Sequence, residues 1–134
     1  MDQAHRELVA HSRNRMKPHT NLLKAIMASA PANVRLFQND QGSVELIDGR
    51  HITYGLLTGS SDLIGWTVIR GIAVFTGVEA KIGSDKVRPA QAQWRFQVTS
   101  QGGIAIVARS VEECWQLHTA ATNKLLASFN SISP

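Results

Sequence analysis

The sequence predicts a mixed α/β fold in which a small β-sheet is flanked by helices. Two β-branched, apolar runs, 62–69 and 72–82, are separated by Arg70-Gly71, which is typical of a tight hairpin turn. A helical stretch that opens at Pro89 and a short apolar strand follow this hairpin. Segments with helical periodicity near both ends of the chain would then cover the sheet.

In the first half of the chain, one helix precedes several short strands. The helix is expected over residues 21–30, where four apolar residues recur at helical spacing before a proline: Leu22, Leu23, Ile26 and Met27. Residues 34–37 alternate as a short strand. A turn at 41–43, a strand over 44–47, a turn at Asp48-Gly49 and a strand over 51–57 complete a β-rich middle.

In the second half, a helix, a strand and a second helix are expected. The helix that begins at Pro89 extends to Ser100 and ends before Gly102-Gly103. Residues 104–107 form a short apolar strand. Ser110 and Glu113 have the spacing of a capping box at the start of the last helix. The apolar side of that helix carries Val111, Trp115, Leu125 and Phe129.

The composition limits the class of protein. With 134 residues, 43% of them hydrophobic and 18% charged, we expect one domain over residues 18–134 behind a basic arm or frayed helix over 1–17. No apolar run reaches the roughly 18–20 residues of a membrane span, and the N-terminus has no apolar signal segment, so a cytoplasmic protein is expected. The single cysteine, Cys114, excludes an intramolecular disulfide and a cysteine-rich zinc site.

Basic residues are concentrated in two stretches, 1–24 and 81–95, of a chain whose formal net charge is +4. Clustered cations suit a polyanion such as DNA, because each neutralised phosphate releases condensed counterions. An ordinary solvated surface is the alternative, and charge alone does not decide between the two. The candidate phosphate contacts are Arg13, Arg15, Lys17, Lys86, Arg88 and Arg95.

A charged pair interrupts an otherwise apolar strand. Glu79 and Lys81 are two residues apart and therefore point to the same face. If the hairpin turns at Arg70-Gly71, Asp62 lies opposite Glu79, with their Cβ atoms about 4.5–5.5 Å apart. Two carboxylates this close repel unless a proton or a cation lies between them, and Mg²⁺ prefers such hard oxygen ligands. The alternative is a Glu–Lys ion pair on a solvated face, with Asp62 an ordinary loop acid.

Four motifs in a fixed order carry a family resemblance. They are Gly59-Ser60-Ser61-Asp62-Leu63-Ile64-Gly65, Gly77-Val78-Glu79-Ala80-Lys81, Pro89-Ala90-Gln91 and Gly102-Gly103-Ile104-Ala105. From Leu22 to Glu113 the chain resembles the VRR-Nuc family, the virus-type replication-repair nucleases of the PD-(D/E)xK superfamily. The resemblance implies a restriction-endonuclease-like core. The chain looks like the stand-alone members typical of phages and prophages, which act in a bacterial host cell.

The resemblance also implies a catalytic site for Mg²⁺ or Mn²⁺. Asp62, Glu79 and the backbone carbonyl of Ala80 would hold the metal. Lys81 would position the attacking water and offset charge on the phosphate. Gln91 would support the site from its helix.

This chain departs from the family pattern at two places, and the position of one family residue has an alternative. Ser61 stands where the superfamily has proline, and Gln93 is the alternative if Gln91 is not the family's glutamine. Family members often carry a glutamate near the start of the first helix, where this chain reads His19-Thr20-Asn21. Either the side-chain carbonyl oxygen of Asn21 takes the place of this glutamate at the metal site, or the site binds its metal with fewer negative charges.

These roles imply a metal-dependent, structure-selective DNA endonuclease that cuts branched DNA such as four-way (Holliday) junctions. A homodimer is expected, since a two-fold dimer presents two sites to a two-fold substrate. The missing first-helix acid keeps one alternative open, a DNA-binding module with a degenerate, inactive nuclease site. A sequence-specific restriction-type endonuclease would share the site, but the sequence shows no dedicated base-reading element.

Several other residues are expected to be structural. Cys114 and His118, four apart on the last helix, have a spacing that suits a metal but lie in its apolar stripe, which favours a core position. Trp66, Trp94 and Trp115 are expected in the core, with stacking of Trp94 on a DNA base as the alternative. The histidines beside the basic arm are expected at the surface: His5, His11 and His19.

Overall fold

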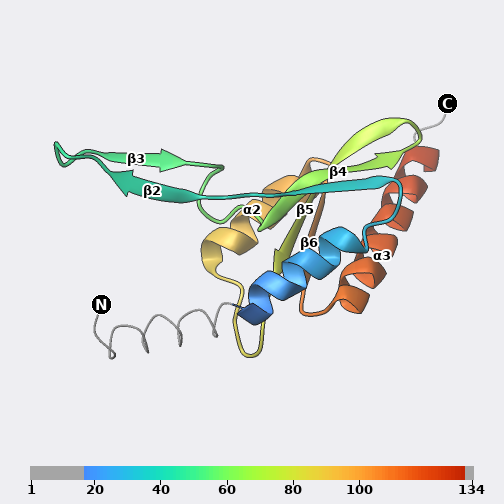
Figure 1. Ribbon diagram of the computed structural model, residues 1–134. Coiled ribbons are helices and arrows are strands. Elements are labelled where there is room, and N and C mark those ends of the chain that lie inside the picture. The colour runs from blue at the N-terminus through green and yellow to red at the C-terminus, as the bar shows by residue number, and fades with distance from the viewer. Residues whose placement is uncertain (1–16, 132–134) are drawn as a thin grey trace.

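The computed structural model describes residues 17–131. A helix that covers residues 17–28 leads into β1 (Val34–Gln38). The strands β2 (Gly42–Glu45) and β3 (His51–Tyr54) precede the long strands β4 (Leu63–Ile69) and β5 (Ile72–Ala80). Then follow α2 (Pro89–Ser100), β6 (Ile104–Ala108) and α3 (Val111–Ser131). The predicted mixed α/β fold is confirmed (Figure 1), while residues 1–16 of the expected arm lie outside the described residues.

The main sheet has the order β1-β4-β5-β6. β1 and β5 pair antiparallel with β4, whereas β6 pairs parallel with β5, which requires the crossover that α2 provides. Arg70 and Gly71 both have positive φ angles, 52° and 77°, as a tight hairpin turn of the type I′ kind requires. The observed pairing of Leu63 with Val78 confirms the predicted turn and register.

β2 and β3 form a separate two-stranded hairpin that projects away from the rest of the molecule (Figure 1). The predicted turn at Asp48-Gly49 is confirmed, because Asp48 Oδ1 accepts a hydrogen bond from the backbone N–H of Arg50 at 3.0 Å. The predicted turn at 41–43 is wrong, since β2 begins at Gly42 and pairs with Tyr54. A Cβ at Gly42 would lie 2.3 Å from the Tyr54 hydroxyl, so this glycine makes room for a ring.

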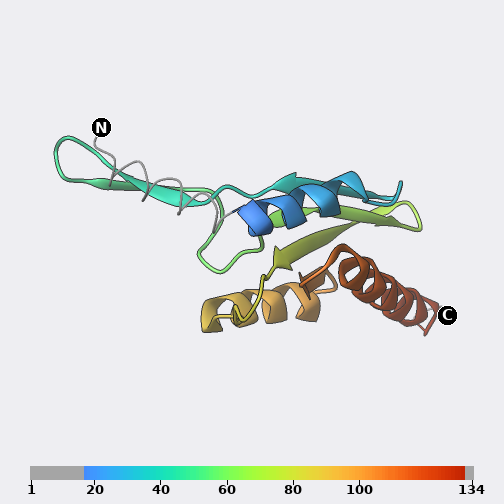
Figure 2. The same cartoon turned by 60° about the horizontal axis from the view of Figure 1, so that its bottom comes forward.

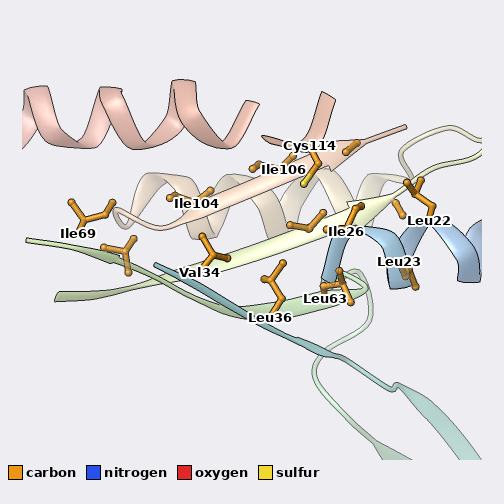
Figure 3. Close-up of a cluster of buried hydrophobic side chains, with 14 residues drawn as sticks. Leu22, Leu23, Ile26, Val34, Leu36, Leu63, Ile69, Ile104, Ile106 and Cys114 are labelled. Atoms are coloured by element: carbon orange, nitrogen blue, oxygen red, sulfur yellow. The ribbon is translucent and has the colours of Figure 1, made fainter. Parts of the chain in front are cut away.

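The hydrophobic core lies between one face of the main sheet and two helices, the one over residues 17–28 and α3 (Figure 3). Alternate residues of the strands point into it, as the pleat of a sheet dictates. Cys114 of α3 joins the same cluster. The buried apolar residues are Leu22, Leu23, Ile26, Val34, Leu36, Leu63, Ile69, Val74, Val78, Ala80, Ile104, Ile106, Ala108 and Cys114.

The first helix and α2 lie on opposite sides of the sheet (Figure 2). α2 covers its side only in part: Trp94 packs edge-on against Phe75, with ring centroids 6.0 Å apart. Beyond this contact, neighbouring apolar side chains of β1, β4 and β5 stay exposed, and the expectation that Trp66 lies in the core is wrong. We refer to them as the open apolar face: Phe37 (50% exposed), Trp66 (40%), Val68 (41%) and Phe75 (42%).

α3 begins at the predicted cap. The backbone N–H of Glu113 donates to Ser110 Oγ at 3.0 Å, and the Glu113 carboxylate accepts from the backbone N–H of Arg109. α3 is long, but neither it nor another helix within residues 17–131 is apolar enough to cross a membrane.

Candidate functional site

The end of the β4–β5 hairpin brings together the acidic and basic residues that the sequence singles out. The register of Leu63 with Val78 places Asp62 opposite Glu79, one step beyond the end of β4. Asp62 Oδ2 accepts a hydrogen bond from the backbone N–H of Ala80 at 2.9 Å. Lys81 follows, and its ammonium group lies 3.9 Å from Glu79 Oε1.

The loop that carries Asp62 is fixed by the end of β1. Asn39 donates its side-chain amide to the Ser61 carbonyl at 2.8 Å and to Ser60 Oγ at 2.9 Å, and its backbone N–H donates to the Asp62 carbonyl at 2.8 Å. Gly59 has a φ of +96°, and a Cβ there would lie 2.5 Å from the Ala90 carbonyl oxygen. Glycine therefore lets this loop pass close to the start of α2.

Gln91 links the helix α2 to both charged residues of β5. Its Oε1 accepts hydrogen bonds from Lys81 Nζ and from the backbone N–H of Arg88, both at 2.9 Å. Its Nε2 donates to Glu79 Oε1 at 3.0 Å. Because a backbone N–H can only donate, Arg88 fixes which end of the amide faces it, and the NH₂ group must point to Glu79.

The two carboxyl groups disturb one another. Burial, followed by the negative charge of Asp62, raises the pKa of Glu79 from 4.5 to about 7, and the positive charge of Lys81 only partly opposes this. Glu79 and Lys81 are 5% and 6% exposed, so water screens their charges weakly. A cation between the carboxylates would relieve the repulsion, which makes the site attractive to a divalent metal.

His19 approaches the same point from the first helix. Its Nε2 lies 3.3 Å from Asp62 Oδ2 and 3.1 Å from the Ala80 carbonyl oxygen. The expectation of an ordinary surface histidine is therefore wrong. Asn21 is exposed, and since residues two apart on a helix point about 200° apart, it faces away when His19 faces the carboxylates. Only the resemblance, which marks the start of this helix, gave a signal that could have found His19.

The site opens to solvent through two hollows that share Asp62 and Gln41. One, of about 280 Å³, is bordered by Glu79, Arg88 and Gln91, and the other, of about 580 Å³, by His19 and Tyr54. Gln41 lines both hollows, and its side-chain amide donates to the Ser60 carbonyl at 3.1 Å. A phosphate and water can therefore reach the carboxylates.

The candidate phosphate contacts fall into three groups. Lys86 and Arg88 are exposed in the loop between β5 and α2. Arg109 holds that loop, because its guanidinium donates to the carbonyls of Gly83 at 3.0 Å and Asp85 at 2.6 Å. Arg95 is half-buried on α2, and Lys17 is exposed at the start of the described chain. Arg13 and Arg15 lie outside the described residues, as do His5 and His11.

Cys114 and His118 lie in the core, as expected from the apolar stripe. His118 Nε2 is 2.9 Å from Thr67 Oγ1, and burial lowers the pKa of this histidine. Burial raises the pKa of the Cys114 thiol to about 12, which removes it as a nucleophile at neutral pH.

Ser61, where the superfamily has proline, is buried, and its hydroxyl has no hydrogen-bond partner in the described chain.

The donor atoms suit a hard divalent cation. Asp62 and Glu79 offer carboxylate oxygens and Ala80 a carbonyl oxygen, which are the ligand types of Mg²⁺ and Mn²⁺. Within residues 17–131, no three His, Cys, Asp or Glu side chains converge closely enough to hold a metal by themselves. Such a site would therefore need the backbone carbonyl and water, as magnesium sites in proteins commonly do.

Comparison with known proteins identifies the family. A family model described as the VRR-NUC domain matches residues 8–112, more than half of the chain. The chain belongs to the VRR-NUC family. Membership implies a nuclease of the virus-type replication-repair group that acts on DNA. No curated protein and no solved structure matches the chain. The matched part of this VRR-NUC protein contains Asp62, Glu79, Lys81 and Gln91, while the phage origin stays a prediction.

Proposed function

We propose that this VRR-NUC protein is a metal-dependent, structure-selective endonuclease that hydrolyses phosphodiester bonds of branched DNA such as four-way junctions. The observation that carries the proposal is the placement of Asp62 beside Glu79, with Lys81 held next to them by Gln91. The alternative of a solvated Glu–Lys ion pair fits poorly, because both of these side chains are buried.

Mg²⁺ or Mn²⁺ is the proposed cofactor. Asp62, Glu79 and the Ala80 carbonyl would hold it, and when bound it would polarise a DNA phosphate and lower the pKa of a coordinated water. A metal would also neutralise the two facing carboxylates, whose repulsion raises the pKa of Glu79 in addition to the effect of burial.

The remaining steps rest on the protein's own groups. Lys81, oriented by Gln91, would hold the attacking water and offset the negative charge that builds on the phosphate. As in similar enzymes, in-line attack would leave a 5′-phosphate and a 3′-hydroxyl. Lys86 and Arg88 would bind flanking phosphates, which positions the DNA without reading its sequence.

We also propose a homodimer, and the open apolar face supports it. Phe37, Trp66 and Phe75 lie side by side on adjacent strands and are 40% exposed or more. The projecting β2–β3 hairpin adds further exposed apolar side chains, among them Val44 and Ile52 at 51% each. A monomer rarely exposes a contiguous apolar surface of this kind, and a second copy of the chain is the occupant we propose.

The test of the endonuclease proposal compares labelled four-way junction, flap and linear duplex as substrates. Cleavage would be measured with Mg²⁺, Mn²⁺ and EDTA, for the wild type and for Glu79→Ala and Lys81→Ala. We expect metal-dependent cutting of the junction that both variants lose. Glu45→Ala, which changes an exposed glutamate of β2, is the matched control and should cut normally.

Other outcomes would redirect the proposal. Cutting confined to the flap would retain the nuclease but reject the junction as substrate. A folded protein that shifts DNA in a gel without cutting it, equally well with EDTA, would instead be the DNA-binding module with an inactive site.

A further inference from the structure

His19 lies where two candidate metal ligands meet. Its Nε2 is 3.3 Å from Asp62 Oδ2 and 3.1 Å from the Ala80 carbonyl oxygen, so one nitrogen faces two oxygens of different residues. No other described histidine makes a hydrogen-bond contact with these two residues.

Hydrogen bonding satisfies this arrangement only in part. Nε2 carries at most one hydrogen, which cannot point well at both oxygens. If Nε2 carries none, its lone pair faces the lone pairs of two oxygens, and the contacts are repulsive. A cation bound by all three atoms would satisfy each of them at once.

The spacing matches that of adjacent ligands around an octahedral ion. With octahedral metal–ligand distances of about 2.0–2.1 Å, neighbouring ligands lie about 2.9 Å apart. The observed separations of 3.1 Å and 3.3 Å come close to that edge length. Of the two side chains, 36% of His19 and 24% of Asp62 are exposed, so an ion can enter from solvent.

We propose that His19 Nε2 is a direct ligand of the metal that Asp62 and Ala80 hold, and that it makes the site prefer Mn²⁺ over Mg²⁺. This inference rests on the proposed function, because it concerns the same metal site. Mn²⁺, although it binds nitrogen less tightly than the later transition metals, accepts an imidazole ligand more readily than Mg²⁺, which favours oxygen ligands. A neutral ligand at this position also leaves the site with two carboxylate charges, fewer than an all-carboxylate set would bring.

The test measures the metal itself and needs no cleavage. Mn²⁺ is titrated at pH 8 into the untagged full-length protein, and pulsed electron paramagnetic resonance detects a ¹⁴N nucleus bonded to the ion. Competition with Mg²⁺ gives the ratio of the two affinities. The variants are His19→Glu, which supplies an oxygen ligand, and His19→Gln, with His51→Gln on exposed β3 as the matched control.

We expect the ¹⁴N coupling in the wild type and in His51→Gln, and its loss in both His19 variants. In His19→Glu, Mn²⁺ should still bind, but the preference for Mn²⁺ over Mg²⁺ should fall by about 10-fold or more. Bound Mn²⁺ that shows no ¹⁴N coupling in the wild type, or coupling that persists in His19→Gln, would overturn the inference and leave the metal site intact. No binding of Mn²⁺ at millimolar concentration would overturn this inference and the proposed function together.

Discussion

The side-chain oxygen of Gln91 accepts a hydrogen bond from the ammonium group of Lys81 at 2.9 Å. This bond is shorter than the 3.9 Å that separates Lys81 from Glu79, so the glutamine orients the lysine more closely than the ion pair does. The same oxygen is held by the backbone N–H of Arg88 at the start of α2. The position of a rigid helix thus determines where the lysine points.

Replacing Gln91 with alanine should therefore lower the rate of cleavage rather than the affinity for DNA. Without the amide, Lys81 loses the group that directs it, and misplacement of a catalytic group by about 1 Å can cost about 10²-fold in rate. Single-turnover cleavage of a junction, together with a gel-shift titration, would separate the two effects. Gln93→Ala on the same helix is the control, because Gln93 is exposed and should tolerate the change. Equal rates for the two variants would contradict this role of Gln91.

Metal affinity should depend on pH because of Glu79. The pKa of this carboxyl group is raised to about 7, so below pH 7 a metal must displace a proton from it. We expect the affinity for Mn²⁺ to fall by up to about 10-fold for each unit of pH below 7 and to level off above pH 8. Calorimetric titrations at pH 6, 7 and 8 would show this, and measurements in buffers of different ionisation enthalpy would count the protons released.

Two variants sharpen that experiment. Repeating the titration with His19→Gln isolates the share of the pH dependence that belongs to Glu79. Glu45→Gln, an exposed glutamate in the projecting hairpin, should leave the titration unchanged. An affinity that stays constant from pH 6 to pH 8 would show that Glu79 is not protonated near neutrality.

The sequence predicts that Asp62 and Glu79 face one another because their pairing depends only on the short turn between the two strands. A two-residue turn at Arg70-Gly71 determines which residues face one another along the whole hairpin, and the observed pairing of Leu63 with Val78 follows from it. The helix that begins at Pro89 also has the predicted bounds, Pro89–Ser100, so Gln91 occupies the first turn as expected.

His19 and Gly42 show where local patterns stop being informative. His19 reaches the site only because its helix packs its apolar side, Leu22 and Ile26, on the core, and no short-range pattern specifies that placement. Gly42 resembles a turn residue in the sequence, but in the structure its lack of a side chain leaves room for the ring of Tyr54 in the partner strand. In both cases the deciding partner is distant in the sequence.

A buried polar chain should contribute to stability independently of the site. Thr67 Oγ1 shares hydrogen bonds with His118 Nε2 at 2.9 Å and with Thr76 Oγ1 at 2.7 Å, and Thr76 donates to the Val74 carbonyl at 3.0 Å. Thr67→Val would leave the buried His118 nitrogen without its partner. We expect a loss of about 1–3 kcal/mol in the free energy of unfolding, measured by urea denaturation.

The control for this change is Thr53→Val, which alters an exposed threonine of β3 and should shift the free energy of unfolding by no more than about 0.5 kcal/mol. A loss for Thr67→Val as small as that of the control would mean that the hydrogen bonds of His118 add nothing to stability.

Dimerisation through the open apolar face predicts a specific effect of Trp66. This residue is 40% exposed and lies between Arg35 and Phe75 on the neighbouring strands, so a charged side chain can replace it without entering the core. We expect light scattering after size exclusion to give twice the 14.6 kDa monomer mass for the wild type, and the monomer mass for Trp66→Lys. Phe96→Lys, at an exposed position of α2, should remain dimeric.

Trp66→Lys should still bind Mn²⁺, because its metal site is intact, but it should nick a junction on one strand at a time. A wild type of monomeric mass at micromolar concentration, or a dimeric Trp66→Lys, would refute this interface.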